Sequence, residues 1–104
     1  MARLEKLQDL LALDPTDSFT RYAIGLEFAK AENYSEAIRT LEELRERDPG
    51  YVPNYYMLAG YYHHTGDDAS ATLIYQEGIS VARTTGDRHA MIELQAALAG
   101  LDDE

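Results

Sequence analysis

The sequence predicts an all-α protein built as an array of antiparallel helical hairpins, and three observations lead to this fold class. The pair Asp14 and Pro15 recurs as Asp48 and Pro49, so that 49 minus 15 gives a period of 34 residues. Each period holds two stretches in which apolar residues recur at three- and four-residue steps, the spacing of an amphipathic helix. Short polar turns separate these stretches. Repetition at such a period is typical of helical hairpins that stack on one another.

The 34-residue period extends well beyond the two prolines. Advancing by 34 leads to a residue of the same chemical type in five further pairs: Tyr22 with Tyr56, Ile24 with Leu58, Phe28 with Tyr62, Ala37 with Ala71, and Leu41 with Tyr75. Small residues are expected to let helix backbones approach closely, while aromatic side chains fill the space beside them. The small residues in question are Gly25, Ala37, Ala59, Ala71 and Gly78.

The first three predicted helices span residues 2–13, 17–31 and 35–47. Leucines at helical spacing mark the first helix, which ends at Asp14 because Pro15 cannot continue it. The second and third helices carry the two apolar stretches of the first period. Ser35 is the expected N-cap of the third helix, since its hydroxyl would accept a hydrogen bond from a free backbone amide. Strand-like alternation is absent from all three stretches.

The last three predicted helices span residues 53–65, 68–85 and 88–100. Pro53 suits the first turn of the fourth helix, where no amide donor is lost, and Asp67 is the expected N-cap of the fifth. After a break at Gly86, the sixth helix carries one apolar stripe, made of Met91, Leu94, Leu98 and Leu101. We expect this helix to cap the array, because a helical stack otherwise leaves an apolar side open to water.

Composition narrows the classes of function. The net charge is −10, from 19 acidic and 9 basic residues, which disfavours nucleic acid and anionic membrane partners. The absence of cysteine excludes disulfides, thiolate metal sites and cysteine nucleophiles. Residues 1–6 carry charges where a signal peptide needs an apolar run, and no run is long enough to cross a membrane. A cytoplasmic protein with one domain over residues 1–104 is therefore expected.

Both periods resemble the tetratricopeptide repeat (TPR), and the chain resembles a small TPR protein of the bacterial type. The matching residues are Ile24, Gly25, Phe28, Ala37, Leu41 and Pro49 in the first copy, and Tyr55, Leu58, Ala59, Tyr62, Ala71, Tyr75 and Gly78 in the second. The resemblance implies a TPR-like α-α superhelix with repeats at 18–51 and 52–85, a partial repeat helix at 1–15 and a capping helix at 86–101. Arg21 stands where the family has a large aromatic residue, and a looser helix contact is expected there.

In this family the first helix of each hairpin lines a concave groove, and the resemblance places eight residues of this chain in it: Phe19, Tyr22, Leu26, Lys30, Tyr56, Gly60, His63 and His64. This groove would be aromatic and almost uncharged. Some TPR domains clamp the acidic tails of chaperones with lysine, arginine and asparagine at such positions, where this chain has Tyr22 and Leu26. An apolar or aromatic segment of a partner is therefore expected instead, and His89 and Ile92 are expected to extend the groove.

The expected function is that of a protein-interaction adaptor, which binds a peptide or helix of a partner protein in this groove. One alternative is a structural homo-oligomer, such as a homodimer, that uses the same apolar surface to bind a second copy. Another is that individual aromatic residues belong to the core.

No enzyme activity, cofactor or metal site is expected. The chain has no glycine-rich phosphate loop and no nucleophile motif. His63 and Asp67 share a helix face by spacing, but no third metal ligand follows from the pattern.

Overall fold

The structure of the chain is a computed structural model that describes residues 2–102, so Met1 and residues 103–104 of the predicted domain lie outside it. The described residues form six helices and no strand: α1 (Ala2–Leu13), α2 (Ser18–Lys30), α3 (Tyr34–Arg47), α4 (Pro53–His64), α5 (Asp68–Thr85) and α6 (Arg88–Asp102). The predicted ranges agree with these bounds to within two residues. The all-α fold class is confirmed.

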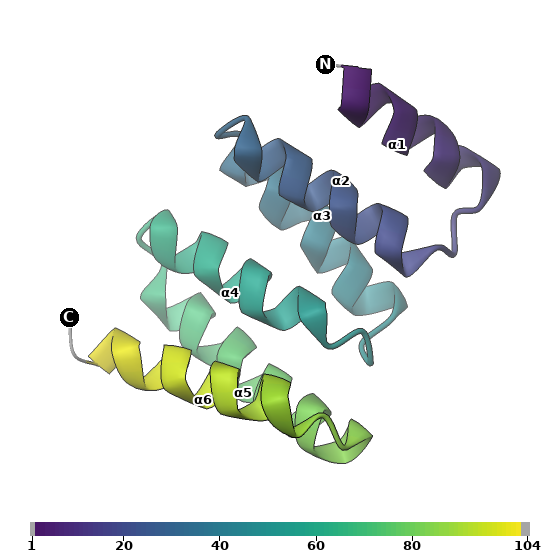
Figure 1. The fold of residues 1–104 in the computed structure, drawn as a ribbon. Coiled ribbons are helices and arrows are strands. Elements are labelled where there is room, and N and C mark those ends of the chain that lie inside the picture. Colours follow the sequence, from purple (N-terminus) through teal and green to yellow (C-terminus); the bar gives the residue numbers. More distant parts are fainter. Residues whose placement is uncertain (1, 103–104) are drawn as a thin grey trace.

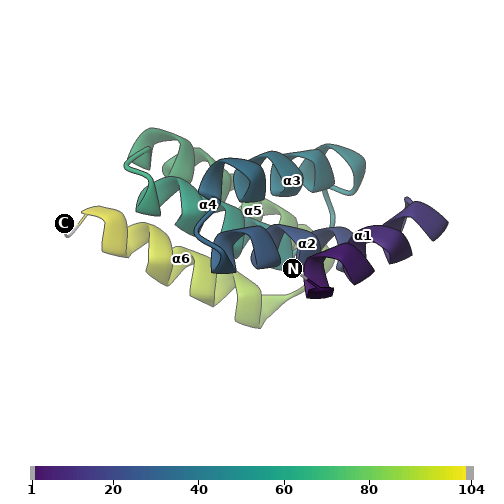
Figure 2. The ribbon, with the colours of Figure 1, turned by 90° about the horizontal axis from the view of Figure 1, so that it is seen from above.

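The helices stack in chain order, with α1 at one end of the array and α6 at the other (Figure 1). The most extensive contacts join α2 to α3, α4 to α5, and α5 to α6. Seen from above, α3 and α6 lie on opposite sides of the array (Figure 2). The core therefore runs through the stack, between consecutive helices.

Small residues at the helix crossings allow this close packing. A Cβ atom added to Gly25 would lie 2.3 Å from Leu41 Cδ2, and one added to Gly78 would lie 2.6 Å from Tyr55 Cβ. Ala37 and Ala71, at matched positions of the two periods, are both fully buried. Any larger side chain at these positions would have to push the helices apart.

The helix ends follow the predicted capping chemistry with one exception. The Asp67 carboxylate accepts a hydrogen bond from the Ser70 amide at 3.1 Å, as expected for the N-cap of α5. Pro53 occupies the first turn of α4. The prediction of Ser35 as the N-cap of α3 is wrong, because the side chain of Asn33 caps this helix instead, by accepting from the Glu36 amide. The helix begins one residue earlier than expected, so Ser35 already lies inside it.

Arg21 does not loosen its helix contact. Its side chain is only 9% exposed, and its guanidinium donates to Glu43 Oε2 at 2.8 Å and to the Pro15 carbonyl at 2.7 Å. The aliphatic stem fills the place of an aromatic ring, while the charged end finds two acceptors at its edge. The polar substitution is thus compatible with tight packing of α2 on α3.

Candidate functional site

The array is curved, and the first helix of each hairpin lies on the inside of the curve. Helices α2 and α4 touch each other, as do α4 and α6, whereas no Cα atoms of α3 and α5 come within 8 Å of each other. Helices that touch on one side of a stack and diverge on the other must form a concave surface where they touch. We call the surface formed by α2, α4 and α6 the inner face.

A cluster of aromatic rings covers the inner face between α2 and α4. The rings of Tyr22 and Tyr51 have centroids 5.6 Å apart, and the ring of Tyr34 lies 5.8 Å from Tyr61 and 4.4 Å from His64. Contacts at these separations add to the stability gained from burial. We call these five residues the aromatic cluster.

A hollow of about 250 Å³ opens in this surface beside Gly60. Its walls are the side chains of Tyr34, Tyr56, Met57, Tyr61 and His64. A Cβ atom added to Gly60 would meet nothing within 4 Å, so the missing side chain contributes directly to the open space. We call this feature the Gly60 hollow. Its walls carry phenol and imidazole groups but no carboxylate, lysine or arginine.

A second hollow of about 210 Å³ adjoins the first, because Tyr56 lines both. It lies where α6 packs beside the start of α4, and its remaining walls are Val52, Pro53, Asp87, His89, Ala90, Glu93 and Leu94. The inner face thus has two adjoining hollows. The Gly60 hollow is aromatic, and the second is mostly apolar with two carboxylates at its edge.

Two phenols of the inner face, those of Tyr22 and Tyr61, have a raised pKa. Burial, together with the neighbouring Tyr22 and Tyr34, raises the pKa of Tyr61 to about 12. Burial also raises the pKa of Tyr22 above its ordinary value. Since desolvation disfavours the phenolate, these side chains offer hydroxyl groups and apolar ring surface to a ligand, without charge.

The structure brings together part of the predicted groove set. Tyr56, Gly60 and His64 meet at the Gly60 hollow. Tyr22 is half-buried in the aromatic cluster, so its ring serves both the core and the surface. Leu26 is also half-buried, whereas Phe19 and Lys30 are exposed.

Two further predicted residues are not among those that line the two hollows. The Nδ1 atom of His63 lies 2.6 Å from Asp68 Oδ1 at the turn between α4 and α5. His89 does extend the surface, but Ile92 lies on the side of α6 opposite Leu94. Helix α5 ends at Thr85, four residues past the repeat counterpart of Arg47, where α3 ends. The side of α6 that packs on the array also differs from that of α4, since Leu94 is buried whereas its repeat counterpart Gly60 is only half-buried.

Sequence reasoning missed four residues of this surface: Tyr34, Tyr51, Met57 and Tyr61. Met57 and Tyr61 share a helix face with Gly60 and His64 by spacing, and that signal was available. Tyr34 begins α3 and Tyr51 lies in the turn before α4, so only the packing of the hairpins brings them to the site.

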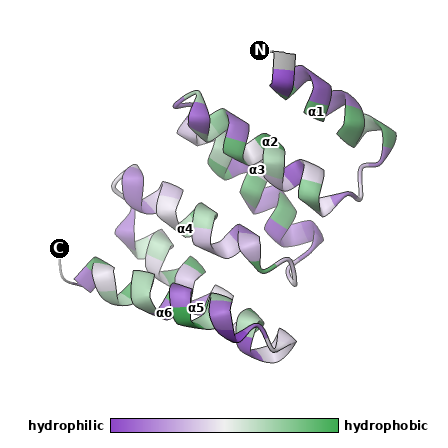
Figure 3. Cartoon of the chain, in the orientation of Figure 1, coloured by the Kyte–Doolittle hydropathy of each residue, from purple (hydrophilic) through white to green (hydrophobic). Residues whose placement is uncertain are grey.

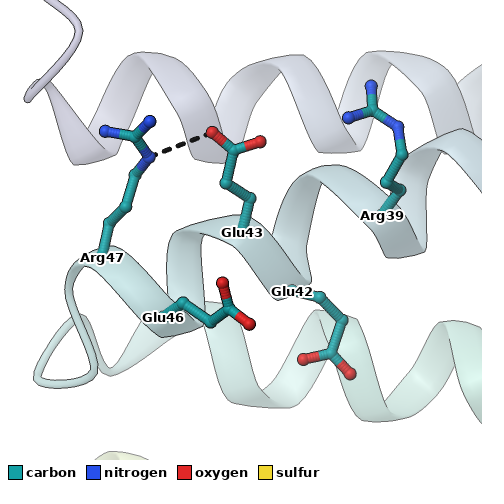
Figure 4. Close-up of a pocket in the computed structure, with 5 residues that line it drawn as sticks. All are labelled: Arg39, Glu42, Glu43, Glu46 and Arg47. Atoms are coloured by element: carbon teal, nitrogen blue, oxygen red, sulfur yellow. Dashed lines mark hydrogen bonds and ion pairs between the residues drawn. The ribbon is translucent and has the colours of Figure 1, made fainter.

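A larger surface hollow, of about 670 Å³, lies elsewhere, on α3, and is lined by Arg39, Glu42, Glu43, Glu46 and Arg47 (Figure 4). All five residues belong to one helix, and four of them form ion pairs with residues of α3 or α2. Arg47 faces Glu43 at 3.0 Å, as the dashed line in Figure 4 shows, and Arg39 pairs with Glu36 at 2.8 Å. Exposed pairs of this kind are typical of a solvated helix surface. The inner face is therefore the better candidate site.

Neither a metal site nor a membrane span emerges from residues 2–102. No group of three or more histidine, cysteine, aspartate or glutamate side chains gathers there as metal ligands. None of the helices in this range combines the length and the apolar character needed to cross a bilayer.

Comparisons with known proteins agree on the fold. No protein-family model matches the chain. A TPR repeat-containing protein of Pseudomonas aeruginosa is 28% identical over 99 residues, which cover 95% of this chain and 94% of that protein. The crystal structure of a tetratricopeptide repeat domain protein of Salinibacter ruber has 40% identity and a TM-score of 0.79, covering 84% of this chain and 97% of that one. The solution structure of a protein from Bordetella parapertussis has 27% identity and a TM-score of 0.85, and the match covers 99% of this chain and 90% of that one.

Proposed function

This chain belongs to the tetratricopeptide-repeat family, and from that premise we propose that it is a protein-interaction module whose inner face binds a segment of a partner protein. Repeat arrays of this kind present extended concave surfaces, and binding other proteins is the general use of such surfaces. The observation that supports a specific site is the Gly60 hollow, since its walls are mainly aromatic and apolar side chains, the lining that is typical of ligand sites.

The chemistry of the inner face narrows the class of partner segment. Tyrosine rings supply large contact areas at low entropic cost, and their hydroxyl groups can pair with a peptide backbone. The Gly60 hollow carries no lysine or arginine to hold a carboxylate. We therefore propose that an apolar or aromatic side chain of the partner enters the hollow, from a peptide or a helix lying across α2 and α4.

The substitution Gly60→Leu separates binding from folding. A leucine side chain would fill the hollow, and we expect the affinity for the partner to fall at least tenfold. Stability should rise by about 0.5–1 kcal/mol, because glycine is unfavourable in a helix interior and the added Cβ meets no neighbour. A partner captured from the source cell and identified by mass spectrometry would be titrated calorimetrically against both proteins, with thermal melting in parallel.

Gly100→Leu is the matched control, because Gly100 also lies in a helix with open space around it but away from the hollow. It should leave partner affinity unchanged. If Gly60→Leu binds the partner as tightly as the original chain, the site lies elsewhere. If the captured partner proves to be the chain itself, the inner face serves self-association, which is the alternative raised by the sequence.

A further inference from the structure

Helix α1 exposes a side that its repeat counterpart covers. Leu10 occupies the repeat position of Leu44, since 44 minus 10 is 34. Leu44 is 1% exposed, whereas Leu10 is 53% exposed. Leu7 corresponds in the same way to the fully buried Leu41 but is only half-buried. The difference arises because α3 has contacts with both α2 and α4, whereas α1 contacts α2 alone among the described helices.

The open side of α1 is apolar in the middle and charged toward both ends. Helical spacing places these residues on it: Lys6, Leu7, Leu10, Leu13 and Asp14. We call this set the α1 face. Leu13 is 84% exposed, and just after the turn Phe19 is 66% exposed. The hydropathy colouring shows the same concentration of apolar residues in the second half of α1 (Figure 3). Several large apolar side chains thus lie in water at this end of the array.

The α1 face is complementary to itself. Leu7 and Leu13 lie three residues to either side of Leu10, and Lys6 and Asp14 lie four residues to either side. If two α1 helices pack antiparallel with Leu10 on the twofold axis, Leu7 faces Leu13 of the second copy and Lys6 faces Asp14 of the second copy. Both charge pairs are then favourable, and the symmetry places no like charges opposite each other within this set.

The groups needed for this arrangement are accessible. Lys6 is exposed. Asp14 is also exposed, and the hydrogen bonds that it accepts from the amide and hydroxyl of Thr16 use only Oδ1. Arg3 already pairs with Glu27 at 3.5 Å and is not required.

We propose that the α1 face binds a second copy of this chain as a twofold-symmetric pair of antiparallel α1 helices. The leucines supply the affinity by leaving water, and the Lys6 and Asp14 pairs set the antiparallel direction. A contact that uses the same face on both copies closes at two chains and does not grow further. This surface is separate from the inner face, so the dimer forms whether or not the inner face has a partner bound.

The first test measures molar mass by light scattering and sedimentation over about 1 μM to 1 mM of the whole chain. We expect a concentration-dependent shift from one copy to two and no larger species. Leu10→Glu places two carboxylates at the twofold axis and should raise the dissociation constant at least tenfold. Leu73→Glu is the matched control, since Leu73 is 66% exposed on α5, off the α1 face, and it should leave the dimer intact.

Two further variants test the geometry. The chain contains no cysteine, so Leu10→Cys should form an interchain disulfide under mild oxidation, and Leu73→Cys should form far less. Lys6→Asp and Asp14→Lys should each weaken the dimer, whereas an equimolar mixture of the two, or both changes in one chain, should restore it.

Three results would overturn the proposal: a chain that stays monomeric up to 1 mM, a dimer that Leu10→Glu leaves intact, or an assembly that grows beyond two copies. A dimer that Gly60→Leu breaks and Leu10→Glu does not would assign self-association to the inner face instead.

Discussion

Replacing Leu94 by alanine lowers the free energy of unfolding by about 2–5 kcal/mol, the usual cost of removing a buried leucine side chain and leaving a cavity. Leu94 is 1% exposed and is the only fully buried residue among the described residues of α6. Its Cδ1 atom lies against Gly78, where α5 crosses α4. The capping role of α6 therefore depends mainly on this side chain. Chemical denaturation followed by circular dichroism would measure the loss.

Ile92→Ala on the same helix is the control for this change. Ile92 is 56% exposed, so its truncation should alter stability by no more than about 0.5 kcal/mol. Equal losses for the two variants would show that α6 does not cap the array through Leu94. The pair also tests the orientation of α6, since the repeat counterparts of Leu94 and Ile92 differ in exposure in the opposite sense: Gly60 is half-buried and Leu58 is fully buried.

Replacing Ala71 by leucine destabilises the chain by about 1–3 kcal/mol, because three carbon atoms enter a helix contact that has no room for them. Ala71 is fully buried in the cluster that joins α4 to α5. For a domain of this size, such a loss lowers the melting temperature by roughly 5–20 °C. Differential scanning calorimetry would measure the shift.

Ala69→Leu gives the matched comparison for the overpacked variant. Ala69 lies two residues earlier on the same helix and is exposed, so the same substitution should change the melting temperature little. An unchanged melting temperature for Ala71→Leu would contradict the alignment of the two repeats, because that alignment is what assigns Ala71 to the crossing.

Most of the fold could be predicted from the sequence, because each helix is marked by a local pattern and the hairpin pattern occurs in two copies. Helical spacing identified each helix, and the 34-residue period showed which small residues meet at the crossings, as the fully buried Ala37 and Ala71 demonstrate. Details that depend on one hydrogen bond, such as the identity of an N-cap, were harder to predict from the sequence. Both Asn33 and Ser35 are good capping residues, and only the position of the turn decides between them.

The candidate site was readable only in part, because it is made by packing between hairpins. Tyr56, Gly60 and His64 followed from the repeat, since they lie on one side of one helix. Tyr34 and Tyr51 have no tyrosine counterpart at the 34-residue spacing. Their contacts, of Tyr34 with Tyr61 on α4 and of Tyr51 with Tyr22 on α2, depend on how the hairpins pack. The exposure of Ile92 could not be read from the period, because its repeat counterpart Leu58 is fully buried.

Because α1 packs on one side only, we expect it to have the lowest local stability of the six helices. It has no fully buried side chain among its described residues, and it packs only against α2. Amide hydrogens of α1 should therefore exchange with solvent through local opening, at a much lower free energy than those of α4 and α5. Anything that covers α1 raises that local free energy by mass action, so hydrogen exchange in α1 would rise and fall with the occupancy of its open side.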